Sequence, residues 1–295
     1  MTSSIVIANQ KKVDSGEEMA TKKSKKRKNK GWRNAANSDR HELYELSVQD
    51  AESECEIIDQ VWSECRQRKA TSIREDFCGT ALTASAWVKL RKDNEAVCVD
   101  NDQTVLDWAA DRVKERLADN ERSRISFVNS DVNTVNTKPV ESVLAMNFSY
   151  YLFKTRKDLL AYFRSVHKSL TDDGLFLLDA YGGSDSFLEM EEDRDLDGFT
   201  YIWDQHSYSP VTGDAINHIH FSFPDGSRME KAFTYEWRLW TLPEIQEVLK
   251  EAGFSKVVVY WEGSDEDSEE GNGEWEVTRC GEACEGWIAY LVAEK

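Results

Sequence analysis

Cysteine and proline are scarce in this sequence, and long apolar runs are missing from its 295 residues. The six cysteines are too sparse for a disulfide scaffold, which suits a reducing compartment. No run of about 18 apolar residues exists, so we expect no membrane span. The N-terminal residues lack the apolar core of a secretory signal, and we therefore expect a soluble, cytoplasmic protein. The cysteines are Cys55, Cys65, Cys78, Cys98, Cys280 and Cys284.

Metal-ligating residues are also sparse near the C-terminus. Cys280 and Cys284 form a C-x3-C pair, but the chain has only five histidines and none follows His220. A structural zinc site takes about four nitrogen or sulfur ligands. We therefore interpret the two thiols as incidental and expect no metal.

Positive charge is scarce over most of the chain. The net charge is −18, from 37 Lys and Arg against 55 Asp and Glu. Residues 1–38 hold ten Lys and Arg and three Asp and Glu, so this segment carries +7 and the remainder carries −25. An acidic body does not favour binding along phosphate backbones, so nucleic acid is not the expected partner.

Residues 1–38 are predicted to be a disordered basic tail, because few apolar residues follow Ile7. The basic run 22–30 is consistent with a nuclear address, with a nucleic-acid arm or with a solvated tail. Removing the whole tail should leave the stability of the remaining domain unchanged.

From residue 39 to the C-terminus the pattern is that of an α/β domain. Short apolar runs alternate with segments of helical spacing, and the order β–α–β predicts a parallel sheet covered on both faces. Two more strand-like runs near the C-terminus bring the sheet to seven strands. Residues 265–276 between those two runs are rich in acids and are predicted to be a solvated loop. The expected strands are 73–77, 96–102, 125–131, 142–147, 175–179, 256–261 and 287–292, and the expected helices lie within 39–68, 82–90, 104–118, 156–170 and 241–253.

The pattern changes between residues 199 and 240. Three strand-like runs, 199–208, 215–223 and 229–240, are separated by two sequences typical of turns. This predicts an antiparallel β meander inserted into a Rossmann-like three-layer sandwich. We expect the meander to form one wall of a substrate pocket, because some 40 extra residues leave the sheet at its carboxyl edge. An interface between copies of the chain is the alternative.

The first strand ends in Glu75-Asp76 and is followed by the compact turn Cys78-Gly79-Thr80-Ala81. An acid at the strand end and a turn into a helix N-terminus are how Rossmann-like folds receive an adenosine ligand. Only one glycine is present, so the fingerprint G-x-G-x-x-G is not met. The next two strands also end in acids, Asp100 and Asp131.

These features, taken in order, resemble the class I S-adenosylmethionine-dependent methyltransferases over residues 39–295. Glu75 stands where the family has its first-strand acid, and Gly79 stands at the middle glycine of acid-x-Gly-x-Gly-x-Gly. Phe77 and Ala81 replace the outer glycines. The turn also looks like that of a poorly characterised subgroup of the family, which reads Arg-Glu-Asp-Phe-Cys-Gly-Thr-Ala there.

Later motifs extend the resemblance. Asp100 matches the acid that binds the ribose in the family, and Asp131-Val132 matches the pair beside the adenine. The run from Asn147 to Tyr150 matches the fourth-strand motif near the reactive sulfonium. Residues 170–179 look like the family's Leu-x-Pro-Gly-Gly motif without its proline.

The resemblance implies S-adenosylmethionine as cofactor and a set of site residues. The cofactor is expected to contact Tyr44, Arg74, Glu75, Gly79, Asp100, Asn101, Asp131, Val132 and Asn147. Tyr150 and His218 are the expected catalytic residues. The acceptor is expected to contact Tyr151, Tyr181, Trp203, His206, His220 and Arg238.

The predicted function is therefore methyl transfer to a small molecule. A non-catalytic adenosylmethionine-binding module is one alternative, since two motif glycines are missing. A protein or nucleic-acid methyltransferase is another, and the fold does not select among them.

Overall fold

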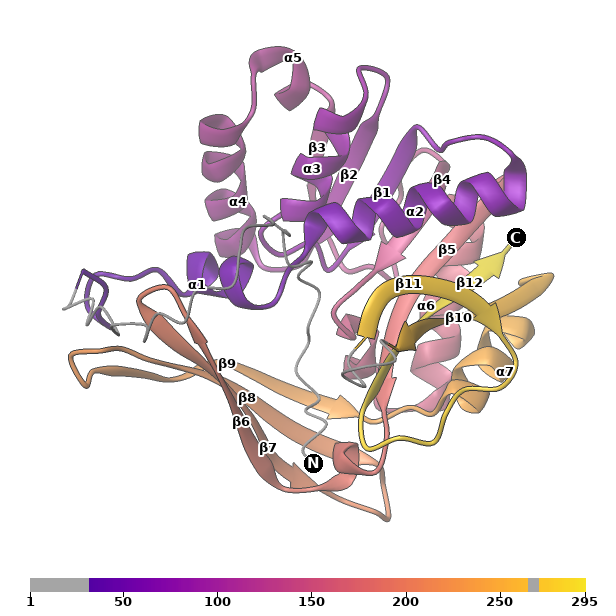
Figure 1. The fold of residues 1–295 in the computed structure, drawn as a ribbon. Helices are drawn as coiled ribbons and strands as arrows, with labels where there is room; N and C mark the ends of the chain where they lie inside the picture. The colour runs from indigo at the N-terminus through magenta and orange to yellow at the C-terminus, as the bar shows by residue number, and fades with distance from the viewer. Residues whose placement is uncertain (1–31, 265–270) are drawn as a thin grey trace, which may run out of the picture.

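The computed structural model describes residues 32–264 and 271–295 and contains two β-sheets (Figure 1). The strands are β1 (Ser72–Asp76), β2 (Glu95–Asp100), β3 (Ile125–Asn129), β4 (Val140–Ala145), β5 (Leu170–Gly182), β6 (Met190–Leu196), β7 (Phe199–Tyr208), β8 (Asp214–Ser222), β9 (Arg228–Arg238), β10 (Lys256–Ser264), β11 (Gly271–Thr278) and β12 (Trp287–Glu294). The helices are α1 (Arg40–Ser47), α2 (Ala51–Arg66), α3 (Leu82–Leu90), α4 (Gln103–Arg116), α5 (Asp119–Arg122), α6 (Arg156–Ser169) and α7 (Leu242–Ala252), with 3-10 turns η1 (Ser149–Leu152) and η2 (Asp185–Phe187).

The main sheet has the strand order β11-β10-β12-β5-β4-β1-β2-β3. Strands β1 to β5 pair in parallel, and β12 runs antiparallel to both β5 and β10. Chain order reverses between β1 and β4, so ligands are expected at the carboxyl ends of these strands. The predicted Rossmann-like α/β class and its mostly parallel sheet are confirmed.

The predicted count of seven strands is one short. An eighth strand, β11, pairs antiparallel with β10 at the sheet edge and occupies part of the acidic stretch predicted to be a loop. The acidic side chains of β11 are exposed to water. Charged side chains are well tolerated in a strand at the edge of a sheet. Residues 265–270 of that stretch lie outside the described residues.

Helices cover the main sheet on both faces, which makes three layers. On one face α2, α3 and α4 bury a core around Trp62, Trp87 and Leu106. On the other face α6 and α7 bury Phe163 and Leu249 against the sheet. The helix α7 begins with the predicted capping box of Thr241 and Glu244 and ends at Gly253. No helix in the described part of the chain is both long and apolar enough to cross a membrane.

The inserted segment forms a second, antiparallel sheet with the order β6-β7-β8-β9. Its last three strands follow the predicted runs closely. The first strand, β6, was not predicted, because its sequence MEEDRDL is almost entirely charged. The strand exists because it pairs with β7 over all seven residues, from Met190 with Gln205 to Leu196 with Phe199.

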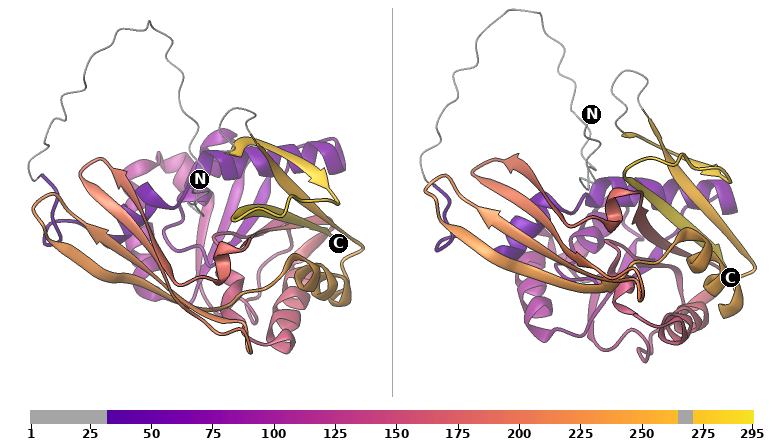
Figure 2. Two further views of the ribbon diagram at one scale, coloured as in Figure 1. Left: turned by 60° about the horizontal axis from the view of Figure 1, so that its bottom comes forward. Right: turned by 90° about the horizontal axis from the view of Figure 1, so that it is seen from below.

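The second sheet lies across the carboxyl edge of the main sheet (Figures 1 and 2). The ring of Trp237 in β9 contacts Phe148, which follows β4, and Tyr181, at the end of β5. Side chains alternate along each strand, so Phe199, Tyr201 and Trp203 face this contact and join the main core. We call this side of the sheet the inner face and the opposite side the outer face.

Residues 32–38, which the sequence assigns to the disordered tail, contact the second sheet. The Ala35 amide donates to Ser227 Oγ at 3.0 Å, and Arg33 pairs with Glu42 of α1 at 2.9 Å. The Trp32 ring lies against Gly198, where an added Cβ would sit 2.9 Å from it. The contacts of the domain therefore extend at least to Trp32, and the predicted boundary after residue 38 is too late. Residues 1–31 lie outside the described part.

Two shortened chains test this boundary. A chain that starts at Asp39 should melt about 2–4 °C below a chain that starts at Trp32, because it lacks the Arg33 ion pair and the Ala35 hydrogen bond. Differential scanning calorimetry measures the difference. Arg33→Ala in the longer chain should reproduce part of the loss, and equal melting temperatures for the two chains would contradict the assignment.

Candidate functional site

The turn after β1 is shaped by residues in the left-handed backbone region. Phe77, Gly79 and Ala81 have φ values of 57°, 49° and 55°. Non-glycine residues rarely adopt this region, at a cost of about 1–2 kcal/mol each. Phe77 and Ala81 therefore adopt a conformation that favours glycine, although neither is glycine. The backbone of the turn is therefore left-handed at both positions where this sequence replaces a glycine of the family motif.

Asp100, at the end of β2, is joined to this turn. Its Oδ2 accepts a hydrogen bond from the Gly79 amide at 3.0 Å, and its Oδ1 accepts one from the Asp102 amide at 3.0 Å. The backbone contacts fix the carboxylate at the carboxyl edge while leaving it partly exposed. Asn101 beside it is exposed. The structure thus brings together Gly79 and Asp100, which the sequence predicted to share a site.

Asp131 and Val132 follow β3, the strand next to β2. Asp131 is exposed, and its Oδ1 accepts hydrogen bonds from the Asn133 amide and the Asn133 side chain. Val132 is 5% exposed and belongs to the main core. One acid and one apolar side chain therefore stand beside the ends of β1 and β2.

The loop after β4 is held by Asp179 of β5. The Asn147 amide donates to Asp179 Oδ2 at 2.7 Å and the Phe148 amide donates to Oδ1 at 2.8 Å. Both donors have left-handed φ values, 56° and 55°. Burial raises the pKa of Asp179 to about 7, and the two amide donors oppose that shift. Asn147 is half-buried at the end of this loop.

The two tyrosines that follow are buried and bonded to backbone. The Tyr150 hydroxyl donates to the Asp179 carbonyl at 2.7 Å, and the Tyr151 hydroxyl lies 3.3 Å from the Trp240 carbonyl. Both side chains are 0% exposed, and burial raises their pKa well above the usual range. The predicted catalytic role of Tyr150 and the predicted acceptor contact of Tyr151 do not fit this geometry. Both side chains position the loop instead.

Two buried acids lie on the α2 and α3 side of this edge. Glu75 accepts a hydrogen bond from the Ala84 amide at 3.2 Å, and the Glu54 carboxylate accepts one from the Thr83 hydroxyl. Burial raises the pKa of Glu54 to about 8. Burial, and then the charge of Glu54, also raise the pKa of Glu75 well above its usual range. The two carboxyl groups therefore keep their protons to a higher pH than exposed acids do.

Arg74 lies on the opposite face of β1 from Glu75. It is 0% exposed and its Nε stands 2.8 Å from Asp76 Oδ1. The Tyr162 hydroxyl of α6 donates to the same carboxylate at 3.0 Å. This placement differs from the predicted cofactor contact. A fully enclosed ion pair beneath the turn is structural, because breaking it would leave a buried charge without a partner.

The inner face of the second sheet carries aromatic rings toward the β4 and β5 ends. Tyr181 packs on Phe148 with ring centroids 4.7 Å apart, and Trp203 contacts Trp237 at 6.1 Å. These contacts place Tyr181 and Trp203, both predicted acceptor residues, in one cluster. The cluster also includes Trp237, which the sequence analysis did not select.

Several polar atoms on this inner face have no hydrogen-bond partner within the described chain. They include Tyr201 Oη and Asn217 Nδ2, in side chains 4% and 2% exposed. The Asn217 and Tyr181 side chains interact, but no hydrogen bond of normal geometry joins them. A buried donor without a partner costs about 1–3 kcal/mol. Such atoms are typical of a site that a ligand completes.

Tyr44 of α1 lies beside the same face. Its ring packs on Phe233 of β9 with centroids 5.0 Å apart, and its side chain is paired with that of Tyr235. Arg194 of β6 donates to the Ser47 carbonyl at the end of α1. The helix and the second sheet therefore cover the carboxyl edge together.

Four of the predicted residues lie elsewhere. His206, His218 and His220 are on the outer face of the second sheet, where they contact one another and Asp204. This placement, away from the carboxyl edge, does not favour the expectation that His218 is catalytic and that His206 and His220 contact the acceptor. Alternation along β8 explains this, because Ile219, which lies between His218 and His220, faces inward and belongs to the main core.

Arg238 also belongs outside the inner-face cluster. Its guanidinium stacks 3.8 Å from the Trp240 ring and pairs with Glu244 at 2.9 Å. These contacts join the end of β9 to the start of α7. They give Arg238 a structural role, which does not favour the predicted acceptor contact.

Sequence reasoning missed Glu54, Asp179 and Asn217. Asp179 carried a signal, because it ends the fifth strand as Asp100 ends the second. Glu54 is the one acid beside the apolar stripe of α2 that becomes buried, and helical spacing does not distinguish it from its exposed neighbours. Asn217 gave no signal, because its importance depends on the face it occupies.

Comparison with known proteins adds no sequence relative: no family model matches the chain, and no curated protein does. Solved structures match well. An S-adenosylmethionine-dependent methyltransferase from Clostridium acetobutylicum is 17% identical with a TM-score of 0.62, over 85% of this chain and 96% of that one. CalS10, an amino pentose methyltransferase from Micromonospora echinaspora solved with SAM bound, is 12% identical with a TM-score of 0.60, over 86% and 94%. The sugar N-methyltransferase KedS8 from Streptoalloteichus is 15% identical with a TM-score of 0.58, over 95% and 99%.

The chain therefore has the fold of the S-adenosylmethionine-dependent methyltransferases. The match extends over nearly the full length of these neighbours. It confirms the fold that the sequence resemblance implied.

Ala81 gives a direct test of the left-handed turn. Ala81→Gly should destabilise the protein by about 1–2 kcal/mol less than Ala84→Gly, because glycine relieves the left-handed strain at only one of these positions. Both alanines are 0% exposed, so the two changes remove equally buried methyl groups. Urea unfolding measures both free energies, and equal losses would refute the strained geometry.

Glu54 gives a pH test. A buried acid with a raised pKa keeps its proton in the folded state and loses it in the unfolded state between about pH 4.5 and 8, so stability falls as pH rises through this window. The stability of the native protein relative to Glu54→Gln should fall by at least about 2 kcal/mol from pH 5 to pH 8. Urea unfolding at both pH values measures this. Glu52→Gln, at an exposed position of α2, serves as control and should show the same difference at both pH values.

Proposed function

We propose that this protein is an S-adenosylmethionine-dependent methyltransferase that acts on a polar small molecule. The carrying observation is the inner face of the second sheet, which covers the carboxyl edge of the main sheet and holds buried polar atoms without partners. A covered site with unpartnered donors suits a small acceptor better than a polymer. The proposal needs both halves, a cofactor edge and an acceptor face.

The cofactor half rests on the ends of β1, β2 and β3. Asp100 is fixed by two backbone amides, and a carboxylate there would accept both ribose hydroxyls. Asp131 and Val132 would border the adenine. Gly79 leaves room for close approach of the ligand to the backbone. A positive charge of the methionine end bound nearby would favour the ionised forms of Glu75 and Glu54, whose pKa values burial raises.

The acceptor half consists of Tyr44, Tyr201, Asn217 and Tyr235, which we call the acceptor surface. The free atoms Tyr201 Oη and Asn217 Nδ2 would bond to hydroxyl or amine groups of the acceptor. Neighbouring rings of Tyr181 and Trp203 supply flat apolar area. Polar atoms set among aromatic rings suit a sugar-sized molecule.

The methyl group of a bound sulfonium is already activated when the cofactor is present. The protein therefore mainly has to position the acceptor and exclude water. The Asn147–Phe148 loop, fixed by Asp179, would set the floor beside the reacting atoms. The second sheet and α1 would keep water out. A general base is required only if the acceptor atom carries a proton at working pH.

The structural neighbours support the choice of acceptor class. One is described as an amino pentose methyltransferase and another as a sugar N-methyltransferase. We therefore propose an amine or hydroxyl of a sugar-like molecule as the first acceptor class to test.

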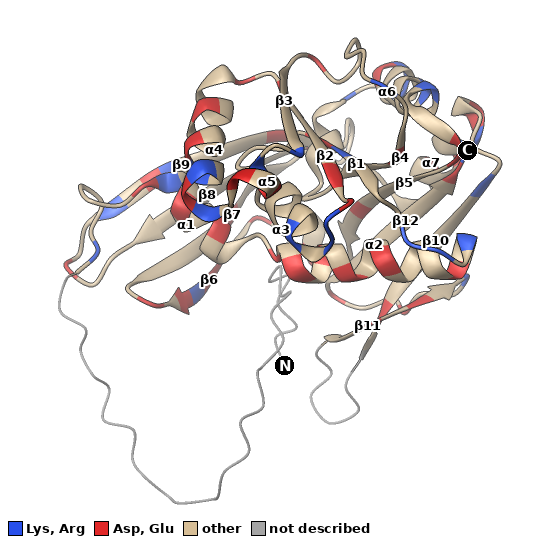
Figure 3. Ribbon diagram, turned by 90° about the horizontal axis from the view of Figure 1, so that it is seen from above, with Lys and Arg blue, Asp and Glu red and all other residues tan. Residues whose placement is uncertain are grey.

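Two other functions are the alternatives. A non-catalytic adenosylmethionine-binding module would use the same left-handed turn at Phe77 and Ala81, and methyl-transfer turnover is the measurement that separates it from an enzyme. A nucleic-acid substrate would need a positively charged surface along which its phosphates could bind. The helix α2 and the strand β6 instead carry several Asp and Glu residues each (Figure 3).

Two groups of variants separate the halves of the site. Asp100→Asn should weaken S-adenosylmethionine binding at least about tenfold, since a charge-assisted hydrogen bond contributes about 1.5–3 kcal/mol. Tyr201→Phe and Asn217→Ala should leave that affinity unchanged and lower turnover of an accepted amino sugar at least about tenfold. Calorimetry measures the affinity, and product mass spectrometry measures turnover.

Tyr208→Phe, in the same strand β7 but outside the acceptor surface, is the matched control and should behave as the native protein. An absence of S-adenosylmethionine binding in the native chain would refute the cofactor half. Normal binding with normal turnover in Tyr201→Phe and Asn217→Ala would refute the acceptor surface alone.

A further inference from the structure

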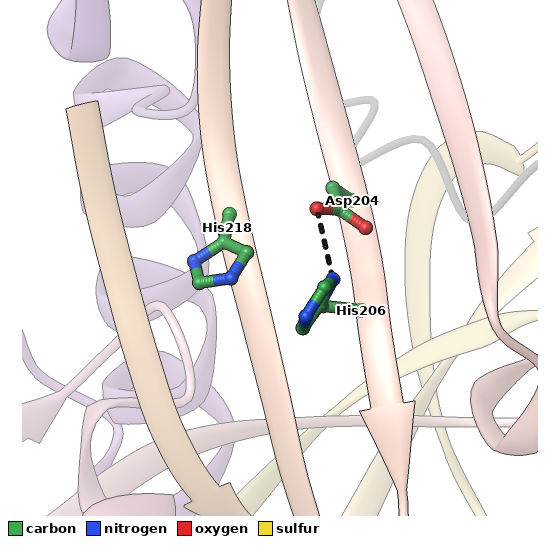
Figure 4. Close-up of side chains that lie close together, drawn as sticks. All are labelled: Asp204, His206 and His218. Carbon is green, nitrogen blue, oxygen red and sulfur yellow. Dashed lines mark ion pairs between the residues drawn. The ribbon is translucent and has the colours of Figure 1, made fainter. Parts of the chain in front are cut away.

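The outer face of the second sheet carries a cluster of histidines and an acid that the proposed methyl transfer does not use. Asp204 and His206 lie in β7, and His218 lies opposite Asp204 in β8. One ligand atom from each of the three side chains lies within 4.8 Å of the others. Figure 4 shows the three side chains turned toward a common space on this face.

The sheet geometry produces this arrangement. Asp204 and His206 are two residues apart and so share a face. The pairing of β7 with β8 shifts register between Gln205 and Ser207, and His206 is the residue left unpaired in that bulge. A bulge re-aims the side chain at its position. It brings the His206 ring to 5.0 Å from the His218 ring, measured between centroids.

His218 supplies the observation that points to a ligand. The residue is 3% exposed, and its Nε2 has no hydrogen-bond partner among the residues described. Its Nδ1 lies 3.0 Å from Thr234 Oγ1 in β9. If that nitrogen donates to Thr234, the lone pair of Nε2 is free and faces His206 (Figure 4). A buried nitrogen lone pair without a donor is costly unless something binds it.

The neighbouring contacts match the surroundings of a metal ligand. Asp204 Oδ2 stands 3.7 Å from His206 Nδ1 and 3.2 Å from His220 Nε2. His220 would orient the Asp204 carboxylate, as Thr234 orients His218. Partners of this kind commonly hold metal-binding side chains in place. The His206 side chain is 53% exposed, so one side of the space is open to solvent.

We propose that Asp204, His206 and His218 form a binding site for a divalent transition-metal ion, with Zn²⁺ as its representative. Two imidazoles and one carboxylate suit zinc and its first-row neighbours better than calcium or magnesium. Ligand atoms around a tetrahedral zinc stand about 3.3 Å apart. The present ligand atoms, within 4.8 Å of one another, would have to move closer for all three to bind one ion. A water molecule would take the open position.

The site would tie β7 to β8 on the face opposite the acceptor surface. Trp203 and Asn217, each of which directly precedes a ligand in the chain, point to the inner face. A metal bound here would therefore stiffen the two strands that carry these residues. The proposal does not depend on the methyl-transfer activity.

The experiment uses the full chain without a polyhistidine tag, after chelator treatment. Cys280→Ser and Cys284→Ser are introduced as a common background, so that the C-x3-C thiols do not bind the probe. Zinc is titrated by calorimetry and cobalt by its visible absorption. We expect one equivalent of zinc in the micromolar range or tighter, and a rise in melting temperature with zinc.

Four variants in that background decide the site. His218→Ala and His206→Ala should each weaken zinc binding at least about tenfold, and Thr234→Val about tenfold by releasing the His218 ring. His167→Ala, a histidine of α6 far along the chain from the cluster, should bind as the parent does. His206 is exposed, so its substitution tests the site even if His218→Ala fails to fold.

Two results would overturn the proposal. One is a parent protein that binds no zinc in the micromolar range. The other is binding that persists undiminished in His206→Ala and in every folded His218→Ala sample.

Discussion

The carboxylate of Asp179 is the interaction on which the site depends. It accepts the amides of Asn147 and Phe148, two consecutive residues in the left-handed backbone region. These two hydrogen bonds stabilise so strained a conformation, together with the backbone contacts of the tyrosines that follow. Asp179 also accepts, through its carbonyl, the hydroxyl of Tyr150. One residue at the end of β5 thus sets the path of the chain beyond β4.

That path decides where the second sheet packs. Phe148 projects from the strained loop and contacts Tyr181 and Trp237. The aromatic cluster so formed joins the inner face of the second sheet to the main core. The inner face in turn carries Tyr201 and Asn217, whose free polar atoms support the proposed acceptor surface. The Asp179 carboxylate therefore holds the strained loop, and the loop places the ring that joins the aromatic cluster.

The two faces of the second sheet have separate chemistry because side chains alternate along a strand. The inner face is aromatic and covers the carboxyl edge. The outer face carries Asp204 and three histidines, and we assign it a metal. Each of the strands β7 and β8 contributes to both faces, so the two proposed sites share a backbone while their side chains stay apart.

The sequence by itself determined the class of fold and the edge of the sheet at which we propose that the cofactor binds. The signals were local: alternating strands and helices, acids at strand ends, and two clear turns in the insertion. Local patterns can be read from the sequence without knowing how the elements pack. Gly79 and Asp100 were placed together correctly because parallel strands end at one edge of a sheet.

Only the tertiary structure decided which side chains face the site. His218 and Asn217 are adjacent in sequence, and a strand sends them to opposite faces, so the choice between them required knowing which face meets the core. Tyr150 and Arg74 were near the predicted edge but are enclosed, because burial depends on elements far along the chain such as α6 and α7. The strand β6 formed from charged residues because β7 lies beside it, a pairing that no local propensity reveals.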